Sequence, residues 1–547
     1  MSYQRGPRVL LALLICSLLA LTVVAATPAS ATEGGTAAGS IIELYPNPTT
    51  EENRGEYATV RITEPGNWTL TDGEGVATLP SDETGRFAAT RHPNATATHT
   101  NATPVTAGGW FQLAVSGETL TLRRGETVVD TISYEDAPES QQWRADREPR
   151  WQPAGFEPRS PTTVTDASVE AFVLPDNPAA PIDAIDDADD RLYLAAYTLT
   201  DDRVIDELTA AHDRGVDVRV LVEGGPVGGM TERQATALDD LTAAGVDVRV
   251  MTGDAARFRY HHAKYAVADD TAVVLTENWK PAGTGGADSR GWGLTTQSAA
   301  TADELAAVFD HDTTWRDTPT WKSVREEIDT VEAEVATGSY PQRHPPLSTT
   351  AAELTVLAAP DNAESELVER INNTDDELLV IQPSIGDRDY RLLEAAIDAA
   401  DRGVKVRLLL SGSWYAEEEN TALAERLRER VAADNVPLSV RVAEDNNRFG
   451  KIHAKGIVAD DTAVIGSLNW NDNSAENNRE VAIAVTDERV ADYYREVFEG
   501  DWQAGSDGGG FSLFPDGEVP AGLVVVAVAV ISATALVAKR WLAFDPE

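Results

Sequence analysis

The run RFGKIHAKGIVADDTAVIGSLNW, residues 448–470, has a close copy earlier in the chain, RFRYHHAKYAVADDTAVVLTENW, residues 257–279. Both copies contain VADDTAV, and both place an asparagine sixteen residues after a histidine. A second matched pair, RGVDVRVLV at 214–222 and RGVKVRLLL at 402–410, extends the similarity toward the N-terminus. These matches indicate an internal repeat.

Each RGV segment follows an amphipathic helical pattern and leads into a strand-like run of Val and Leu. Alternation of strand and helix in both copies predicts α/β architecture around a parallel or mixed sheet. Pro-rich stretches at 149–161 and 340–347 delimit the copies, which we predict at 168–335 and 352–503. Short alternating strands broken by turns predict an all-β sandwich over residues 40–146.

The two ends of the chain predict its topology. An apolar run preceded by arginines and followed by Ala29-Ser30-Ala31 predicts a signal peptide over residues 1–31. A linker, 504–518, precedes an uncharged stretch at 519–538 that is long enough to span a bilayer as a helix. Lys539 and Arg540 favour the cytoplasmic side. We therefore expect a single-pass cell-membrane protein with its main domains outside the cell.

The composition is strongly acidic, with 90 Asp and Glu against 45 Lys and Arg. Only seven of the basic residues are lysines. A uniformly acidic, lysine-poor surface is typical of proteins that stay hydrated at very high salt, so we expect a halophilic source, with an ordinary acidic protein as the alternative. The single cysteine, Cys16, lies in the predicted signal peptide, which excludes disulfides and cysteine metal sites from the mature chain.

The histidine and lysine of each copy are two residues apart, at His262/Lys264 and at His453/Lys455. Residues two apart on a strand face the same side, so each pair should point into one cleft. An isolated pair of this kind usually marks a solvated strand face. Here a chain with seven lysines and eight histidines keeps two of each at matched repeat positions, which favours a functional site.

The pattern H-x-K-x4-D, followed by G/S-x-N, resembles the signature of the phospholipase D superfamily over residues 168–503. The resemblance implies two phospholipase D-like repeats that form one pseudo-twofold unit, with both motifs in one active site and no need for an oligomer. The strings IIELYPNP, NRGEYATVRI and GNWTLTDGEG resemble the lamin-tail domain, an immunoglobulin-like sandwich. They suggest a binding module whose ligand the sequence leaves open.

The resemblance also implies roles for individual residues. One histidine attacks phosphorus to form a phosphohistidine and the other protonates the leaving oxygen, without a metal or cofactor. The family's usual assignment makes His262 the nucleophile and His453 the acid, although nothing in the sequence fixes that order. The motif aspartates, Asp269 and Asp460, are structural. The residues expected to stabilise the phosphate oxygens are Lys264, Lys455, Asn278, Asn469, Thr276 and Ser467.

The first copy departs from the family pattern in its carboxylate. Family members carry an acidic residue after each motif that bonds the far ring nitrogen of histidine. Glu480 takes this role in the second copy, but the first copy has Gly291 at the matching position, and Asp288 is the expected substitute. We expect His261 to serve packing or the surface. A positive funnel toward the site could be formed by Arg257, Arg259, Arg448 and Lys451.

The substrate class stays open at this point. Nucleic acid is favoured, because a secreted lamin-tail-like module beside a phosphodiesterase resembles the architecture of extracellular nucleases. An acidic surface at high salt argues against tight electrostatic binding of DNA. Phospholipid cleavage or phosphatidyl transfer is the alternative, although a cardiolipin-synthase-like role is disfavoured because such enzymes draw substrate from the inner leaflet. A third possibility is a surface binding protein whose catalytic site has decayed.

Overall fold

A computed structural model describes residues 38–504, except for short gaps at 49–52, 98, 148–149, 155, 157, 254–255, 316, 387–389, 435 and 444–446. The predicted signal peptide and membrane span lie outside the described residues. Within them, no helix is long and apolar enough to cross a bilayer. The described residues form two compact units. The first contains the residues up to 136 except 47–53, and the second contains 47–53 and the residues after 136.

The N-terminal unit is rich in β-structure, as predicted. Its first sheet has the order β1-β2-β5-β6, formed by Gly39–Tyr45, Tyr57–Ile62, Gly85–Thr90 and Thr103–Thr106. Its second sheet has the order β7-β4-β3-β8-β9, formed by Gly108–Gly109, Gly75–Thr78, Trp68–Thr71, Gly117–Arg124 and Thr127–Glu135. A single turn of helix, α1, spans Pro93–Thr96. Trp68, Leu70 and Leu122 are fully buried in this unit. The likeness to a lamin-tail domain stays a prediction.

The second unit begins with the hairpin β10 and β11, Gln141–Arg144 and Trp151–Pro153. The first repeat follows. Its strands are β12 Thr162–Leu174, β13 Arg191–Ala196, β14 Asp217–Glu223, β15 Met230–Thr231, β16 Asp247–Met251, β17 Tyr265–Ala268, β18 Thr271–Leu275, β19 Ser289–Gln297 and β20 Thr330–Val331. Its helices are α2 Ala180–Asp183, α3 Asp202–Arg214, α4 Glu232–Ala244, α5 Ala299–Thr313, α6 Trp321–Val324 and the 3-10 turn η2 Arg325–Glu327.

The second repeat has the same order of main elements. Its strands are β21 Leu347–Ala359, β22 Glu377–Gln382, β23 Lys405–Ser411, β24 Leu438–Ala443, β25 Lys451–Ile452, β26 Gly456–Ala459, β27 Thr462–Gly466 and β28 Glu480–Thr486. Its helices are α7 Ala363–Asn372, α8 Arg391–Arg402, α9 Glu417–Asp434, α10 Glu488–Ala504 and the π-helical turn η3 Asn473–Asn477.

One continuous sheet joins the two repeats, in the order β16-β14-β13-β17-β18-β19-β12-β21-β28-β27-β26-β22-β23-β24. The long strands β12 and β21 pair antiparallel at its centre. On either side the same series of pairings recurs, parallel between β13 and β14 as between β22 and β23, and antiparallel from β17 to β19 as from β26 to β28. The predicted α/β fold with a mixed sheet and two related halves is confirmed.

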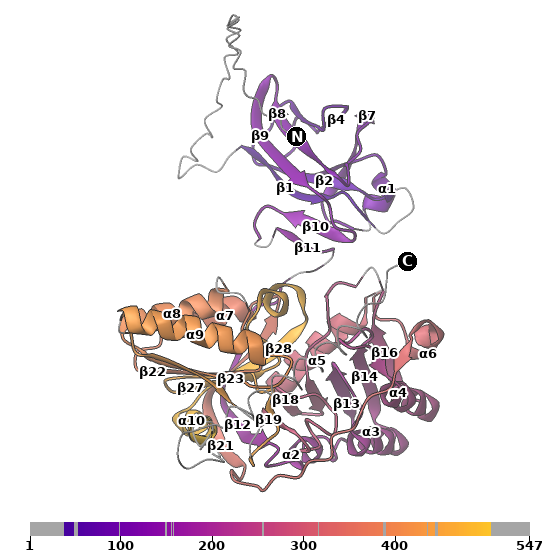
Figure 1. The fold of residues 1–547 in the computed structure, drawn as a ribbon. Helices are drawn as coiled ribbons and strands as arrows, with labels where there is room; N and C mark the ends of the chain where they lie inside the picture. The colour runs from indigo at the N-terminus through magenta and orange to yellow at the C-terminus, as the bar shows by residue number, and fades with distance from the viewer. Residues whose placement is uncertain are drawn as a thin grey trace, which may run out of the picture. The chain divides into compact units, whose positions relative to one another are not determined.

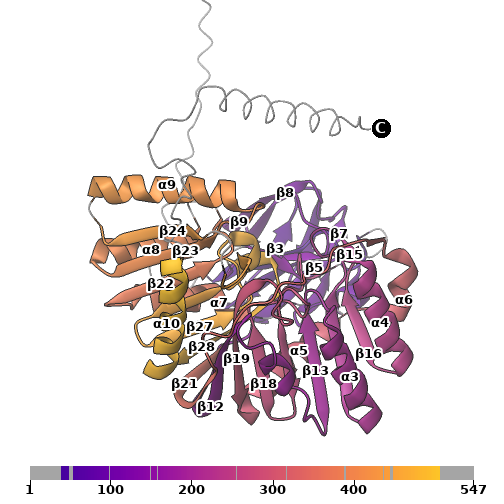
Figure 2. The same cartoon turned by 60° about the horizontal axis from the view of Figure 1, so that its bottom comes forward.

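Helices cover both faces of this sheet. Figure 1 shows α7, α8 and α9 above the strands of the second repeat and α10 below them. In the first repeat α3 and α4 pack on one face, and Figure 2 shows them on the side of the unit away from α10. The central core draws on both repeats and includes Phe309 of α5 and Tyr494 and Phe498 of α10. This shared core explains why the repeats form one unit.

The repeated sequences account for the local structure around the site. Each RGV segment ends a helix at a glycine with left-handed backbone, Gly215 (φ 96°) and Gly403 (φ 102°), and then enters the parallel strand β14 or β23. Each VADDTAV forms a tight antiparallel hairpin, β17–β18 or β26–β27. The first residue of each turn, Asp269 or Asp460, also has positive φ.

Candidate active site

The backbone of each motif histidine is hydrogen-bonded to the opposite repeat. The backbone N–H of His262 donates to the carbonyl oxygen of Arg479 at 2.9 Å, and that of His453 donates to the carbonyl oxygen of Arg290 at 3.0 Å. The two histidine segments therefore cross between the repeats, and both copies of the motif contribute to one site.

His262 is oriented by a carboxylate from the second repeat. Its Nδ1 lies 3.0 and 2.9 Å from the two carboxylate oxygens of Glu480. Burial alone raises the pKa of Glu480, but the nearby His262 and Lys264 lower it below its usual value, so the group is an ionised acceptor. Nδ1 of His262 is then the donor, and Nε2 keeps its lone pair. Glu480 thus acts across the repeats, on the histidine of the other copy.

His453 has a different carboxylate partner, which the sequence reasoning missed. Its Nδ1 lies 3.2 Å from Oε2 of Glu277, whose side chain is fully buried. The expected substitute, Asp288, instead forms an ion pair with Lys451 at 2.9 Å. The prediction for Asp288 is wrong, because its carboxylate, just before β19, pairs with Lys451, while Glu277 contacts the ring of His453. Glu277 therefore supplies the second carboxylate of the site.

The two copies have exchanged the position that carries this carboxylate. A Cβ atom added to Gly291 would lie only 2.1 Å from Cγ of Glu277, so Glu277 fills the space that a side chain at 291 would need. In the second copy the matching positions are Leu468 and Glu480. The first copy has Glu277 and Gly291 where the second copy has Leu468 and Glu480. This reciprocal change is visible in the sequence and could have indicated that the carboxylate occupies different positions in the two copies.

Two buried lysines accompany the histidines. Lys264 donates from Nζ to the carbonyl oxygen of His262, and its ammonium lies 5.1 Å from the ring centre of Tyr197. Nζ of Lys455 donates to the carbonyl oxygen of His453 at 2.6 Å and lies 3.2 and 3.3 Å from the two ring nitrogens. The predicted His/Lys pairs are thus brought together in one place.

Burial shifts the pKa values of the catalytic candidates. It lowers the pKa of His262 to about 4, against the opposing effect of Glu480, and lowers that of His453 well below its usual range. Burial likewise lowers the pKa of Lys455 to about 8 and raises that of Glu277 to about 7. Near neutral pH both imidazoles are therefore neutral in the unliganded protein.

The predicted hydroxyl groups contact the backbone of the neighbouring strand. Oγ1 of Thr276 accepts from the N–H of Trp292 at 2.9 Å, and Oγ of Ser467 accepts from the N–H of Val481 at 3.1 Å. Both residues are fully buried. These bonds fix the strands that carry position 291 and Glu480. The expectation that the two hydroxyl groups bind phosphate oxygens stays a prediction.

The predicted asparagines and aspartates lie in different surroundings. Asn278 is buried, and within the described part of the chain its side-chain oxygen has no hydrogen-bond partner, while Asn469 is half-buried. An unsatisfied buried amide fits a ligand-binding role. The carboxylates of Asp269 and Asp460 each accept three backbone N–H groups, from residues 189–191 and 375–377. They fix the entry into β13 and β22.

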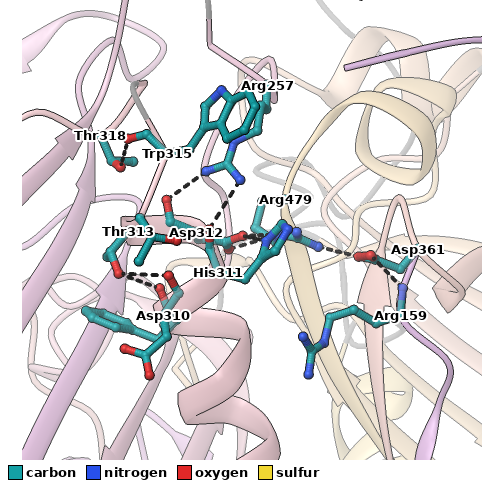
Figure 3. A network of polar contacts seen from close by, with 12 residues as sticks. Arg159, Arg257, Asp310, His311, Asp312, Thr313, Trp315, Thr318, Asp361 and Arg479 are labelled. Atoms are coloured by element: carbon teal, nitrogen blue, oxygen red, sulfur yellow. Dashed lines mark hydrogen bonds and ion pairs between the residues drawn. The ribbon is translucent and has the colours of Figure 1, made fainter. Parts of the chain in front are cut away.

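A buried ionic network beneath the site connects the repeats (Figure 3). Nε of Arg479 lies 2.9 Å from Asp312 at the end of α5, and Nη1 also contacts Asp361 and donates to the carbonyl oxygen of Ala359 at 3.1 Å. Arg290 forms the matching network with Asp176 at 2.7 Å and Asp501 at 2.8 Å. Both guanidinium groups are fully buried. Each arginine thus bridges its own repeat to the last long helix of the other.

Replacing Arg479 by methionine should lower the free energy of unfolding by about 3–5 kcal/mol, because Asp312 and Asp361 would remain buried without their cation. Denaturant unfolding at high salt measures this change. Arg430→Met, which removes an exposed pair with Asp401, is the matched control and should change stability little. Equal effects of the two substitutions would contradict a structural role for the buried network.

The expected funnel of basic residues is only partly present. Arg257 is buried and forms an ion pair with Asp317 at 2.9 Å, and Arg448 pairs with Asp501 at 2.8 Å, so both serve the fold. Arg259 stacks over Tyr260, and Lys451 remains beside the site. His261 is fully buried, which agrees with a packing role. Among the described residues, no cluster of His, Cys, Asp and Glu could hold a metal ion.

Both repeats match one family of known proteins. Residues 182–313 and 367–502 both match the family described as cardiolipin synthase, PLD-like domain. The mitochondrial cardiolipin hydrolase of Xenopus tropicalis is 33% identical over 129 residues, 23% of this chain and 55% of that protein. The chain therefore spans about half the length of this curated relative.

Two solved structures are similar to part of this chain at low sequence identity. The phosphatidylserine synthase of Haemophilus influenzae Rd KW20 has a TM-score of 0.45 at 14% identity, over 61% of this chain and 85% of the other. The phospholipase D family member Nuc of Salmonella typhimurium has a TM-score of 0.23 at 17% identity, over 28% of this chain and 94% of the other.

Proposed function

Because residues 182–313 and 367–502 belong to the phospholipase D superfamily, we propose that the chain is a phosphodiesterase with one active site built from both repeats. The observation that carries the proposal is the pair of crossed contacts, His262 with Glu480 and His453 with Glu277. A carboxylate that contacts one ring nitrogen orients a histidine to act as a nucleophile or to transfer a proton. The proposed site contains two histidines of this kind.

In the proposed reaction, Nε2 of His262 attacks phosphorus while the bond from phosphorus to the leaving oxygen breaks. His262 is the better nucleophile because Glu480 contacts its Nδ1 at 2.9 Å and so leaves Nε2 unprotonated. The leaving oxygen takes a proton from His453. Water then gives a proton back to His453, attacks phosphorus and breaks the P–N bond, which restores the free His262.

In the proposed reaction, His453 becomes protonated when the substrate binds. Burial and the surrounding lysines lower the pKa of His453 in the unliganded protein. A bound phosphodiester places a negative charge beside the ring, which favours the imidazolium form. Lys264 and Lys455 stabilise the charge on the non-bridging oxygens, and Asn278 and Asn469 are the remaining predicted contacts to these oxygens.

Nucleic acid is the substrate class that we propose, with the chain acting outside the cell and tethered by residues 519–538. The site supports this choice through its charge, because four of the seven lysines, Lys264, Lys280, Lys451 and Lys455, are found at or beside it. Lipid is the second candidate, favoured by the strongly exposed Trp414, which could enter a membrane surface. The named activity of the Xenopus tropicalis relative also fits lipid.

The test is an assay of the chain at high salt with a chelator, against single-stranded DNA, RNA and phospholipid vesicles. We expect cleavage of a nucleic acid that survives chelation. Loss of activity on chelation would contradict the metal-free mechanism. Inactivity on every phosphodiester would instead favour a surface binding protein with a decayed site.

The pH dependence of kcat/KM should be bell-shaped, with limbs near pH 7 and 8. Glu277, whose pKa burial raises to about 7, is neutral below that pH and loses its attraction for the imidazolium of His453. Lys455, whose pKa burial lowers to about 8, loses its charge above that pH. Glu277→Gln should move the acid limb toward about 4, where His262 titrates. Lys455→Arg should raise the alkaline limb. A flat profile from about pH 6 to about 9 would refute both assignments.

A further inference from the structure

Two further lysines lie beside the histidines and outside the repeated motif. Lys451 precedes His453 by two residues in an extended segment, so both side chains leave the same face, roughly 6.6 Å apart along the chain. Lys280 follows Asn278 by two residues. Both lysines line one cleft of about 710 Å³, together with Asp288.

The charge of these lysines is only partly balanced. Lys451 forms an ion pair with Asp288 at 2.9 Å. For Lys280, no carboxylate within the described part of the chain lies at ion-pair distance, and burial together with Lys451 lowers its pKa. The carboxylates of Glu277 and Asp288 oppose this lowering from beyond ion-pair distance. A half-buried ammonium without a direct ion pair is still costly, and a bound anion would offset that cost. The acidic residues that line the outer part of the cleft are exposed, where salt screens them: Glu232, Glu332 and Glu334.

This feature belongs to one side of the pseudo-twofold site. The positions that match Lys451 and Lys280 in the other copy are Tyr260 and Asn471, and neither is cationic. The asymmetry distinguishes the two sides of the active site, because Lys280 shares its cleft with Lys451, which lies two residues before His453, and no lysine occupies the matching positions of the other copy. In an in-line displacement the leaving group departs opposite the nucleophile, and with His262 attacking it departs on this side.

Aromatic residues occupy the loop after β23 on the same side. β23 contacts β25, the short strand that begins at Lys451, so the loop after β23 lies near this lysine. Lys451 also opposes the rise in the pKa of Tyr415 that burial causes. Trp414 is 89% exposed and meets the Tyr415 ring edge-on, with centroids 5.8 Å apart. The corresponding loop of the first repeat, Gly224–Gly229, contains no aromatic residue. An exposed indole beside a phosphate site is suited to stack an unpaired base.

We propose that Lys280 and Lys451 bind a second phosphate, on the leaving group, while Trp414 stacks a base, so that the substrate is a single-stranded polynucleotide cut within the chain. This inference rests on the phosphodiesterase function proposed above. It adds that a leaving group carrying its own phosphate is preferred. The chemistry at the scissile phosphate is unchanged.

The experiment compares substrates with one and with two phosphates, using the full chain at high salt. Bis(p-nitrophenyl) phosphate and the dinucleotide TpT carry only the scissile phosphate. The dinucleotides pTpT and TpTp carry a second one, on opposite sides of the scissile bond. We expect a preference for the dinucleotide whose leaving nucleotide carries the extra phosphate. Its kcat/KM should exceed that of TpT by roughly 10- to 100-fold.

Lys280→Gln and Lys451→Gln should abolish that advantage, while hydrolysis of bis(p-nitrophenyl) phosphate changes by a much smaller factor, because only a nearby charge is lost from the surroundings of His453 and Glu277. Each should also reduce the slope of log KM against log salt for the preferred dinucleotide by about 1. Lys405→Gln, an exposed lysine paired with Glu377 away from the site, is the matched control and should have no effect. Trp414→Ala should weaken binding of oligothymidylate by roughly 10-fold.

The outcomes separate this inference from the function on which it rests. If no variant changes the preference, or if Lys280→Gln slows bis(p-nitrophenyl) phosphate equally, the second subsite is refuted while the phosphodiesterase stands. If cardiolipin vesicles are cleaved with the same dependence on Lys280 and oligonucleotides are not, the polynucleotide assignment is overturned in favour of lipid. Failure to hydrolyse even bis(p-nitrophenyl) phosphate would refute the phosphodiesterase itself.

Discussion

Replacing His262 by asparagine should lower kcat/KM for a phosphodiester by at least ~10⁴-fold, because the nucleophile and the covalent route are removed together. Asparagine keeps a similar polar size, and the backbone bond from residue 262 to Arg479 does not need the ring. The fold should therefore survive, which circular dichroism and thermal unfolding can check. His92→Asn in the N-terminal unit is the matched control and should retain full activity.

His453→Asn should give a different result with a substrate whose leaving group needs no proton. With bis(p-nitrophenyl) phosphate, His262 can still displace p-nitrophenolate, but no group remains to activate water for the second step. We expect a burst of one product molecule per chain and a phosphoryl adduct that can be mapped to His262. An adduct on His453 in the His262→Asn variant would reverse the roles, and absence of an adduct from both would exclude the two-step route.

Much of the fold was predictable because its signals are local. The Gly215 and Gly403 helix ends, the strands that follow them and the VADDTAV hairpins each depend on residues that are close in sequence. The repeat then transfers each assignment to the other half, which is why the mixed sheet and the two joined halves were predicted correctly.

The contacts across the repeats could not be predicted in this way. Spacing places Glu480 on a strand, but only the crossed pairing of Arg479 with His262 brings it to the histidine of the other copy. Arg290 and Arg479 pair with carboxylates that are distant in sequence, Asp501 of α10 and Asp312 of α5, so no local pattern indicated that these arginines lie in the core. The basic residues near the motif likewise predicted a positive surface that attracts the substrate. In the structure Arg257 is buried in an ion pair with Asp317.

The exchanged carboxylate provides the second prediction. Glu277→Leu, which introduces the residue found at Leu468 in the other copy, should lower kcat/KM by roughly 100-fold, because His453 loses the group that orients it. Gly291→Glu alone should destabilise the second unit, since even its Cβ would lie 2.1 Å from the Glu277 side chain. The double variant reproduces the combination of Leu468 and Glu480, which occupy the matching positions together in the other copy, and offers a carboxylate at the position matching Glu480.

We expect the double variant to recover kcat/KM to within about 10-fold of the native protein and to recover the Tm lost by Gly291→Glu. Such recovery is a coupling between neighbouring sites that independent effects cannot produce. The double variant Glu277→Leu/Gly291→Ala is the control, since it refills the space without a carboxylate and should stay at the low activity of Glu277→Leu. If both double variants are equally active, Glu277 serves packing alone. If both are as slow as Glu277→Leu, a carboxylate from position 291 does not reach His453, and the two repeats orient their histidines in ways that cannot be exchanged.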